Sequence, residues 1–262
     1  MVDVDEGVNA SGSLLVSCFP SFGFVGSIVA HFLVDKLELE LVGGVRHRDL
    51  PPVCLVQEGR PLPAIRFYSG EPICNMERCD KVILIASEIQ IPSELNLPLS
   101  SGLIDWILDS GVSSTIMIDS FAHGIDKRHS IFDEDEGIET MLGIGSTDSA
   151  HDLLSEIGIP LLKQGVVGGM TGVMMGECRR RDIDALAIIA ESEGEIGQGS
   201  IPDARAAARI IKCLDGLLPA IHLDPEPLLE EAKRIEEQIR EMMAVSLNSP
   251  SDAGSAPTGM YG

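Results

Sequence analysis

The sequence predicts an α/β protein: a three-layer core around a mostly parallel sheet, followed by a C-terminal helical extension. Unbroken apolar runs at 13–19, 81–86 and 185–190 are typical of strands that are covered on both faces. Segments with the helical spacing of apolar residues alternate with these strands, as in proteins whose sheet lies between helices. The segment 226–247 differs, because it combines a narrow apolar stripe with dense surrounding charge.

The first half of the chain supplies the amino-terminal strands and one helix. The expected elements, in order, are a strand at 13–19, a helix at 25–37, a strand at 39–46 and an antiparallel hairpin formed by 52–57 and 63–68. Turn residues separate them, with Pro20 to Gly23 before the helix and Gly59-Arg60-Pro61 inside the hairpin.

The second half repeats the alternation of strands and helices. The expected elements are strands at 81–86, 115–119, 139–145 and 185–190, and helices at 99–110, 147–157 and 203–217. Thr147 or Asp148 begins the second of these helices, and Pro202 and Asp203 lie in the first turn of the third. The run 81–86 is the expected central parallel strand.

Composition restricts the partners and the compartment. A net charge of −22 disfavours nucleic acid and anionic membrane surfaces as partners. No apolar run approaches the ~20 residues that span a bilayer, and the N-terminal segment is acidic where a signal peptide is basic, so we expect a soluble cytoplasmic protein.

The six cysteines do not form a disulfide framework in a chain of this length. Four residues separate Cys74 from Cys79, which is a weak indication of zinc without a second pair. Cys18, Cys178 and Cys213 lie in apolar or helical contexts and are interpreted as core thiols. No metal and no cofactor is expected.

Catalytic signals in the core are weak. The turn Phe22-Gly-Phe-Val-Gly26 resembles a phosphate loop but lacks the dinucleotide pattern and the Walker lysine. The glycine-rich stretch 165–176 exposes backbone N–H groups before a helix, but its neighbours are apolar, so a tight loop between layers is the preferred interpretation. Asp119 and His123 follow a strand, where α/β proteins place their chemistry. Glu191 and Glu193 end the last strand and are interpreted as solvated acids.

A helix at 226–247 carries a coiled-coil seam. Its apolar residues recur at spacings of four and three, as the a and d positions of a heptad do; they are Leu228, Ala232, Ile235, Ile239 and Met242. Two interpretations have equal weight: an oligomerisation helix, and a terminal helix that packs on its own domain. The expected domains are a core at 1–222, this helix at 223–247 and a flexible tail at 248–262.

The tail ends in Met260, Tyr261 and Gly262, an apolar residue followed by tyrosine and one more residue. Only one other tyrosine, Tyr68, occurs in the chain. An apolar side chain, a phenol and a terminal carboxylate together match a peptide that docks into a partner's pocket.

Several sequence blocks resemble the family of proteasome assembly chaperone 2 and its archaeal homologues. The blocks occur in consistent order over nearly all of 13–243; they are Phe19 to Gly26, Gly172 to Leu186, Ala190-Glu191 and Pro202 to Ala204. The resemblance implies an α/β core of phosphorylase- or hydrolase-like topology without a known enzymatic activity. It also implies a homo-oligomer, a tetramer or pentamer, with a projecting C-terminal helical segment.

The resemblance further implies that Met260, Tyr261 and Gly262 dock between α subunits of the 20S proteasome. The Gly262 carboxylate would pair with a lysine of the α-ring pocket, Tyr261 would lie at its rim, and Met260 would pack on apolar surface. The expected function is therefore a non-enzymatic assembly chaperone or gate-opening activator. One alternative is a nucleoside phosphorylase-like or hydrolase-like enzyme that uses Asp119, His123 and the 165–172 loop. The other is an oligomeric scaffold whose tail binds another ring ATPase or regulator.

Overall fold

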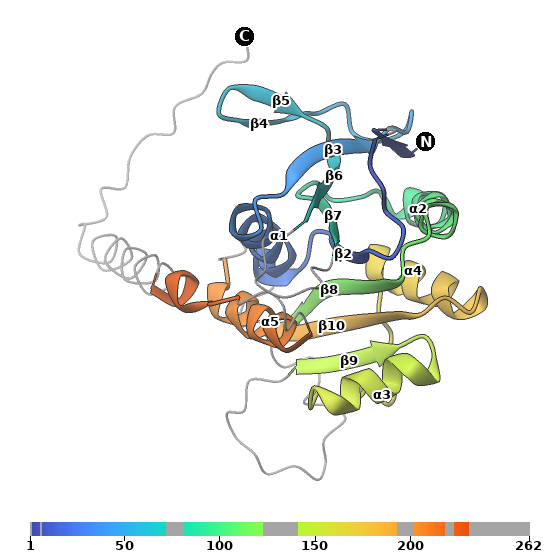
Figure 1. The fold of residues 1–262 in the computed structure, drawn as a ribbon, viewed down its shortest axis with the longest axis vertical. Helices are drawn as coiled ribbons and strands as arrows, with labels where there is room; N and C mark the ends of the chain where they lie inside the picture. The colour runs from blue at the N-terminus through green and yellow to red at the C-terminus, as the bar shows by residue number, and fades with distance from the viewer. Residues whose placement is uncertain are drawn as a thin grey trace, which may run out of the picture.

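The centre of the computed structural model is an eight-stranded sheet with the strand order β1-β3-β6-β7-β2-β8-β10-β9 (Figure 1). The structure describes residues 2–5, 7–71, 81–122, 141–192, 202–217 and 223–230. The strands are β1 Val2–Val4, β2 Leu14–Cys18, β3 Glu40–Val45, β6 Ile65–Gly70, β7 Val82–Ser87, β8 Ser114–Ala122, β9 Met141–Gly145 and β10 Ala185–Ser192.

The sheet is mixed, so the expectation of a mostly parallel sheet is wrong. Parallel pairing is confined to the neighbouring strands β7, β2, β8 and β10. The strands β1, β3 and β6 on one side, and β9 on the other, pair antiparallel. One physical reason is chain length: only residues 71–81 link β6 to β7, fewer than a crossover between parallel strands usually needs.

The expected hairpin is only half correct. A separate two-stranded ribbon pairs β4, Leu55–Gln57, with β5, Arg60–Leu62. The segment expected as the second hairpin strand instead enters the main sheet as β6, between β3 and β7. Both faces of β6 are covered, because four consecutive residues are buried: Ile65, Arg66, Phe67 and Tyr68. The alternation of polar and apolar residues in this strand therefore does not mark one solvent-exposed face and one core face.

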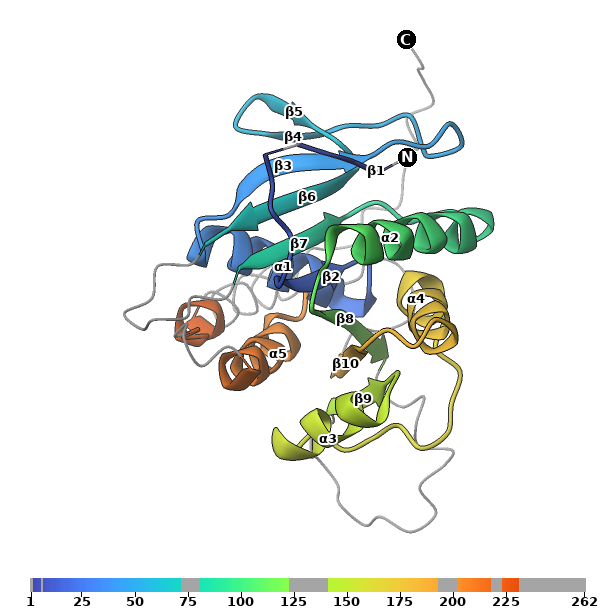
Figure 2. The same ribbon diagram turned by 45° about the vertical axis from the view of Figure 1, so that its right-hand side comes forward.

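Helices cover both faces of the sheet (Figure 2). They are α1 Val25–Lys36, α2 Asn96–Ser110, α3 Asp148–Glu156, α4 Gly169–Arg180 and α5 Ala204–Leu217, with 3₁₀ turns η1 Phe22–Phe24 and η2 Ser93–Leu95. Apolar residues of α1, α3 and α5 form one core cluster with the sheet, and those of α2 and α4 form the other. The described residues contain no helix that is long and apolar enough to cross a membrane.

Thr147 precedes α3 as its cap, as expected, whereas Pro202 and Asp203, expected in the first turn of the last helix, lie just before α5. The Thr147 hydroxyl accepts a hydrogen bond from the backbone N–H of Ala150 at 3.1 Å, which caps α3. The Asp203 carboxylate accepts one from the N–H of Ala206 at 2.9 Å at the start of α5. After α5, Leu223 is buried and Leu228 packs against the α1 and α5 core cluster.

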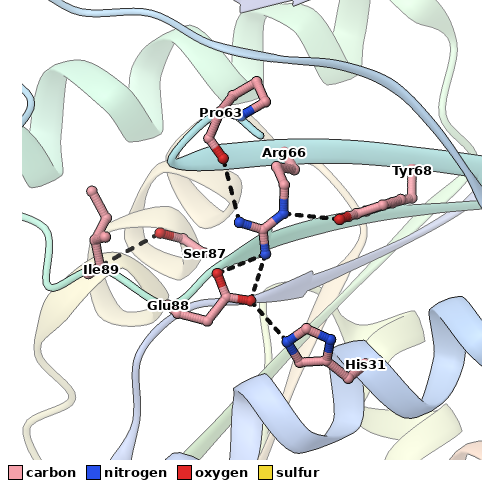
Figure 3. Close-up of polar contacts among 7 residues, drawn as sticks. All are labelled: His31, Pro63, Arg66, Tyr68, Ser87, Glu88 and Ile89. Carbon is pink, nitrogen blue, oxygen red and sulfur yellow. Dashed lines mark hydrogen bonds and ion pairs between the residues drawn. The ribbon is translucent and has the colours of Figure 1, made fainter. Parts of the chain in front are cut away.

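A buried arginine connects β6, β7 and α1 (Figure 3). The Arg66 side chain on β6 is 1% exposed, and its Nη2 donates to both carboxylate oxygens of Glu88, at 2.5 and 2.6 Å. Its Nε donates to the Tyr68 hydroxyl at 2.9 Å, and Nη1 donates to the Pro63 carbonyl at 3.3 Å. Glu88 follows β7 and also lies 3.2 Å from the ring of His31 on α1.

These contacts fix the charge of Glu88. Burial by itself would raise the pKa of this carboxyl, but hydrogen bonds from His31 and Arg66, together with their charges, outweigh it and lower the pKa from 4.5 to about 2. The Arg66 pKa is raised; burial opposes this shift, and the hydrogen bond and charge of Glu88 outweigh burial. Both groups are therefore ionised at neutral pH, as a buried pair must be to compensate each other.

Glu88→Gln is expected to destabilise the protein by about 3 kcal/mol at neutral pH, because it leaves the Arg66 charge buried without a counter-charge. His31→Gln is the control, and since the His31 side chain is half exposed it should cost under about 1 kcal/mol. Urea unfolding measures both.

The same pair predicts a pH dependence. The folded-state pKa of Glu88 is depressed, so its contribution is complete above pH 4.5 and is lost as pH falls toward about 2. The difference in unfolding free energy between wild type and Glu88→Gln should therefore shrink across that interval. A difference that is independent of pH there would contradict the assigned ion pair.

Gly172→Ala is expected to destabilise the protein by about 2 kcal/mol, because a Cβ at this position of α4 would overlap with the backbone carbonyl of Val167. Gly176 lies one turn later in the same helix, and a Cβ there would have nothing within 4 Å. Gly176→Ala should therefore stabilise by about 0.5–1 kcal/mol through helix propensity. Urea midpoints that shift in the same direction for both variants would contradict the close approach.

Candidate functional site

A cavity of about 940 Å³ lies at the carboxyl ends of the parallel strands. Its wall includes residues 19–22 and Phe24 after β2, Glu88 and Gln90 after β7, Asp119–Phe121 of β8, and Leu162 with residues 164–171 leading into α4. This is the edge at which open α/β sheets bind ligands, because the loops that follow neighbouring parallel strands converge there. The volume falls in the range of small-molecule pockets.

The turn after β2 holds a strained backbone at the cavity. Gly23 and Phe24 both have positive φ, 59° and 53°. Glycine is required at Gly23, where a Cβ would overlap with the side chain of Ser192 and press on Asp203. Phe24 adopts the left-handed conformation with a full side chain, at a cost of about 1–2 kcal/mol. Such strain persists only where the surrounding structure enforces it.

Hydrogen bonds from three directions enforce that turn. The Ser120 hydroxyl of β8 donates to the Phe22 carbonyl at 2.6 Å. The N–H of Asp203 donates to the Gly23 carbonyl at 2.8 Å, and the N–H of Gly26 donates to the Ser21 hydroxyl at 2.9 Å. The turn is therefore tied to β8, to the segment before α5 and to α1, and it presents Phe22 and Phe24 to the cavity wall.

Apolar side chains are exposed around the cavity. Phe22 is 41% exposed, Phe24 is 44% exposed and Val166 is 99% exposed, and all three belong to its lining. Exposed apolar groups that gather at a cavity, rather than being scattered singly, mark a binding surface.

Two carboxylates line the cavity in different environments. Glu88 is held by the Arg66 and His31 contacts described above. Asp119 accepts a hydrogen bond from the backbone N–H of Ser120 at 2.8 Å and another from the side chain of Thr171 on α4. Burial raises the pKa of Asp119, and these neutral donors only partly oppose it.

The arrangement favours binding over acyl transfer. A nucleophilic serine needs a base at its hydroxyl, yet the Ser120 hydroxyl donates to the Phe22 carbonyl, and Asp119 contacts Ser120 through its backbone N–H. Among the described residues that line the cavity, the charged ones are Glu88 and Asp119, both acidic. An oxyanion such as phosphate would face these carboxylates without a cationic side chain from that lining.

Sequence reasoning found part of this site. Asp119, the 22–26 turn and the 165–171 part of the glycine stretch do share one cavity. The glycine stretch is only half a loop, however, because α4 begins inside it at Gly169. Glu191 continues β10, and its carbonyl accepts a hydrogen bond from Arg209 at 2.6 Å.

Glu88 and Arg66 were missed. The available signal was a charged residue directly after the buried 81–86 strand, at the strand end where ligands bind. The prediction of core thiols is confirmed for Cys18 and Cys178, which are buried, whereas Cys213 is half-buried. Burial raises the pKa of the Cys213 thiol to about 11.

Several expected site residues lie outside the described part of the chain. These are Cys74, Cys79, His123, Glu193, the seam residues Ala232, Ile235, Ile239 and Met242, and the terminal Met260, Tyr261 and Gly262. Leu228 is the one seam residue that is described, and it contacts the core of its own domain.

Solved structures share this architecture over nearly the whole chain. PbaA of Pyrococcus furiosus, described as an archaeal homologue of proteasome-assembly chaperone, is 26% identical, with a TM-score of 0.78 over 94% of this chain and 92% of PbaA. PbaB of the same organism, described as an archaeal proteasome activator, has a TM-score of 0.74 over 93% of this chain and 98% of PbaB. At 17% identity, the likeness to PbaB shows the fold alone.

The sequence comparisons cover the same region. An uncharacterized protein of Methanocaldococcus jannaschii is 25% identical over 229 residues, which are 87% of this chain and 84% of that protein. The sequence profile of the PAC2 family matches residues 15–243, from β2 to beyond the described start of the C-terminal helix. The chain belongs to the PAC2 family.

Proposed function

We propose that this protein is an archaeal proteasome assembly chaperone or proteasome-binding activator that acts on the α ring of the 20S particle. The observation that carries the proposal is the likeness to PbaA, since the two folds superpose over more than nine tenths of both chains at 26% sequence identity. Membership of the PAC2 family supports it. Under this proposal the protein works by binding and has no catalytic step.

The proposed contact with the α ring is the terminal Met260, Tyr261 and Gly262. The three residues offer an apolar side chain, a phenol with a polar tip and a carboxylate, which together suit a pocket that has apolar walls and a lysine. A tripeptide this small supplies only about micromolar to millimolar affinity. Several copies on one oligomer would bind far more tightly, because the second tail binds at a high effective concentration.

The seam on the C-terminal helix is proposed to make that oligomer. Leu228 packs against the α1 and α5 core, so the helix starts in contact with its own domain. The residues that continue the same stripe, Ala232, Ile235, Ile239 and Met242, are then available to meet the same helix of another subunit. A closed ring of four or five subunits would present its tails together.

The phosphorylase-like alternative has one observation in its favour, namely that Asp119 and the glycine loop share a cavity. The charges of that cavity oppose it. The N-terminus of α4 lines the cavity and could offer backbone N–H groups to a phosphate, but the described charged side chains of the lining are two acids, which repel it. We therefore base the proposed function on binding to the proteasome.

Deleting residues 260–262 is expected to lower the affinity for 20S particles at least about tenfold, and Tyr261→Ala should have a similar effect, because both remove the docked phenol. Surface plasmon resonance with immobilised 20S particles measures this. Thr258→Ala, just before the motif, is the matched control and should bind like wild type. One residue added after Gly262 should weaken binding, since it moves the carboxylate. Equal binding by wild type and the deletion would refute the tail mechanism.

The double substitution Ile235→Asp and Ile239→Asp is expected to reduce the oligomer to monomers, because it places carboxylates in the centre of an apolar seam. Light scattering coupled to size exclusion gives the molar mass. Glu237→Lys changes a position between the seam residues and should leave the mass unchanged. If the double variant keeps the wild-type mass with an unchanged circular dichroism spectrum, the interface lies elsewhere.

A further inference from the structure

We propose that the cavity at the carboxyl ends of β2, β7 and β8 binds a small organic cation, an ammonium or guanidinium group attached to an aromatic or aliphatic body. The proposal goes beyond the function proposed above and does not depend on it. It concerns the core of the domain, whereas binding to the proteasome is assigned to the tail.

The size of the cavity indicates how large its ligand can be. About 940 Å³ is at the upper end of the range for small-molecule pockets, so it accommodates a ligand larger than a single ion or a phosphate. The cavity is open to solvent, since Phe22, Phe24 and Val166 of its lining are exposed, so a ligand can enter it.

The charged residues of the lining indicate the sign of the ligand's charge. Glu88 and Asp119 come from the strands on either side of β2, and they face one cavity. The described lining contains no lysine, arginine or histidine. Arg66 lies behind Glu88 and is 1% exposed, so its guanidinium is not available to a ligand. The charged side chains of the described lining are thus both acidic, and they attract a cation.

Asp119 is the proposed anchor for the cation. Glu88 already has Arg66 as its counter-charge, whereas the described partners of Asp119 are neutral donors, the Ser120 backbone and the Thr171 side chain. Burial raises the pKa of Asp119, so its charged form is disfavoured until a cation lies beside it. Both oxygens of Glu88 already accept from Arg66, so a cationic ligand would pair with Asp119.

Aromatic rings in the lining can contact both the cation and the apolar body of the ligand. Phe22, Phe24 and Phe121 line the same cavity as the two carboxylates. A cation within about 6 Å of an aromatic face gains roughly 0.5–2 kcal/mol, and the same rings pack against an apolar body. The left-handed backbone at Phe24 is the strained feature that presents one of these rings. Carboxylates and phenyl rings around one cavity are the combination that recognises amines and guanidines.

A charge series on one aromatic body tests the proposal. Isothermal titration of the full-length protein uses tryptamine, 3-ethylindole and indole-3-propionate, which carry a positive, zero and negative charge. Tryptamine is expected to bind at least about tenfold more tightly than the other two. Equal or tighter binding of the neutral or anionic compound, or no binding of any cation tested, would overturn the proposal.

A second titration identifies the source of the cation. A blocked Phe-Arg dipeptide amide offers the same chemistry as a basic side chain of a polypeptide. Tighter binding of the dipeptide than of tryptamine would assign the site to a protein segment, and the reverse would assign it to a free amine. Both outcomes support the cationic ligand and separate its two sources.

Two substitutions locate the site. Asp119→Asn removes the anchoring charge and should weaken tryptamine binding about tenfold. Val166→Lys adds a positive charge at the fully exposed rim, where folding is not at risk, and should weaken tryptamine while strengthening indole-3-propionate. Val56→Lys makes the same change at an exposed position of the β4–β5 ribbon and should leave both affinities unchanged. Identical effects of the two lysine variants would contradict the assigned cavity.

Discussion

The ion pair between Arg66 and Glu88 is the interaction on which the arrangement of the core depends. A guanidinium that is 1% exposed is stable only with a counter-charge and full hydrogen bonding. Glu88 supplies the charge, while Tyr68 and Pro63 complete the hydrogen bonds. Arg66 lies on β6, which pairs antiparallel with β7, and Glu88 follows β7, which pairs parallel with β2 on its other side. The ion pair therefore connects the antiparallel part of the sheet to its parallel part.

This tie also shapes the cavity. Glu88 is the first residue after β7, and its side chain is held by Arg66 on one side and by His31 of α1 on the other. The segment that leaves β7 therefore starts from a fixed point, and Gln90, two residues later, joins the cavity wall. On the other side of β2, Asp119 is fixed in the same way, by Ser120 and Thr171. Polar contacts thus hold both carboxylates that line the cavity.

Local patterns were sufficient for most elements and insufficient for the sheet. The 13–19, 81–86 and 185–190 runs became β2, β7 and β10, because continuous apolar sequence is what a doubly covered strand requires. Thr147 and Asp203 were identifiable as caps because capping is a contact within three residues. Strand order depends on contacts between segments far apart in the sequence. The β6 segment has the sequence pattern of a hairpin strand, yet it is buried on both faces and pairs with β3 and β7 in the main sheet. For the same reason Asp119 was visible at a strand end, whereas Arg66 and Glu88, 22 residues apart, were not recognised as a pair.

The two carboxylates of the cavity differ in whether the protein itself compensates their charge. The pKa of Glu88 is about 2 and that of Asp119 is raised, although Glu88 directly follows β7 and Asp119 lies in the C-terminal half of β8, the two parallel strands that flank β2. Burial acts on both in the same direction, so the opposite outcomes come from their partners: a guanidinium and a histidine for one, an amide and a hydroxyl for the other. The charge of Glu88 is compensated within the protein, and its role is to hold the sheet and α1 together. The charge of Asp119 has no such partner among the described residues, so a cation from outside is the group that would complete its environment. One cavity thus contains a carboxylate committed to the fold and a second one that is left for recognition.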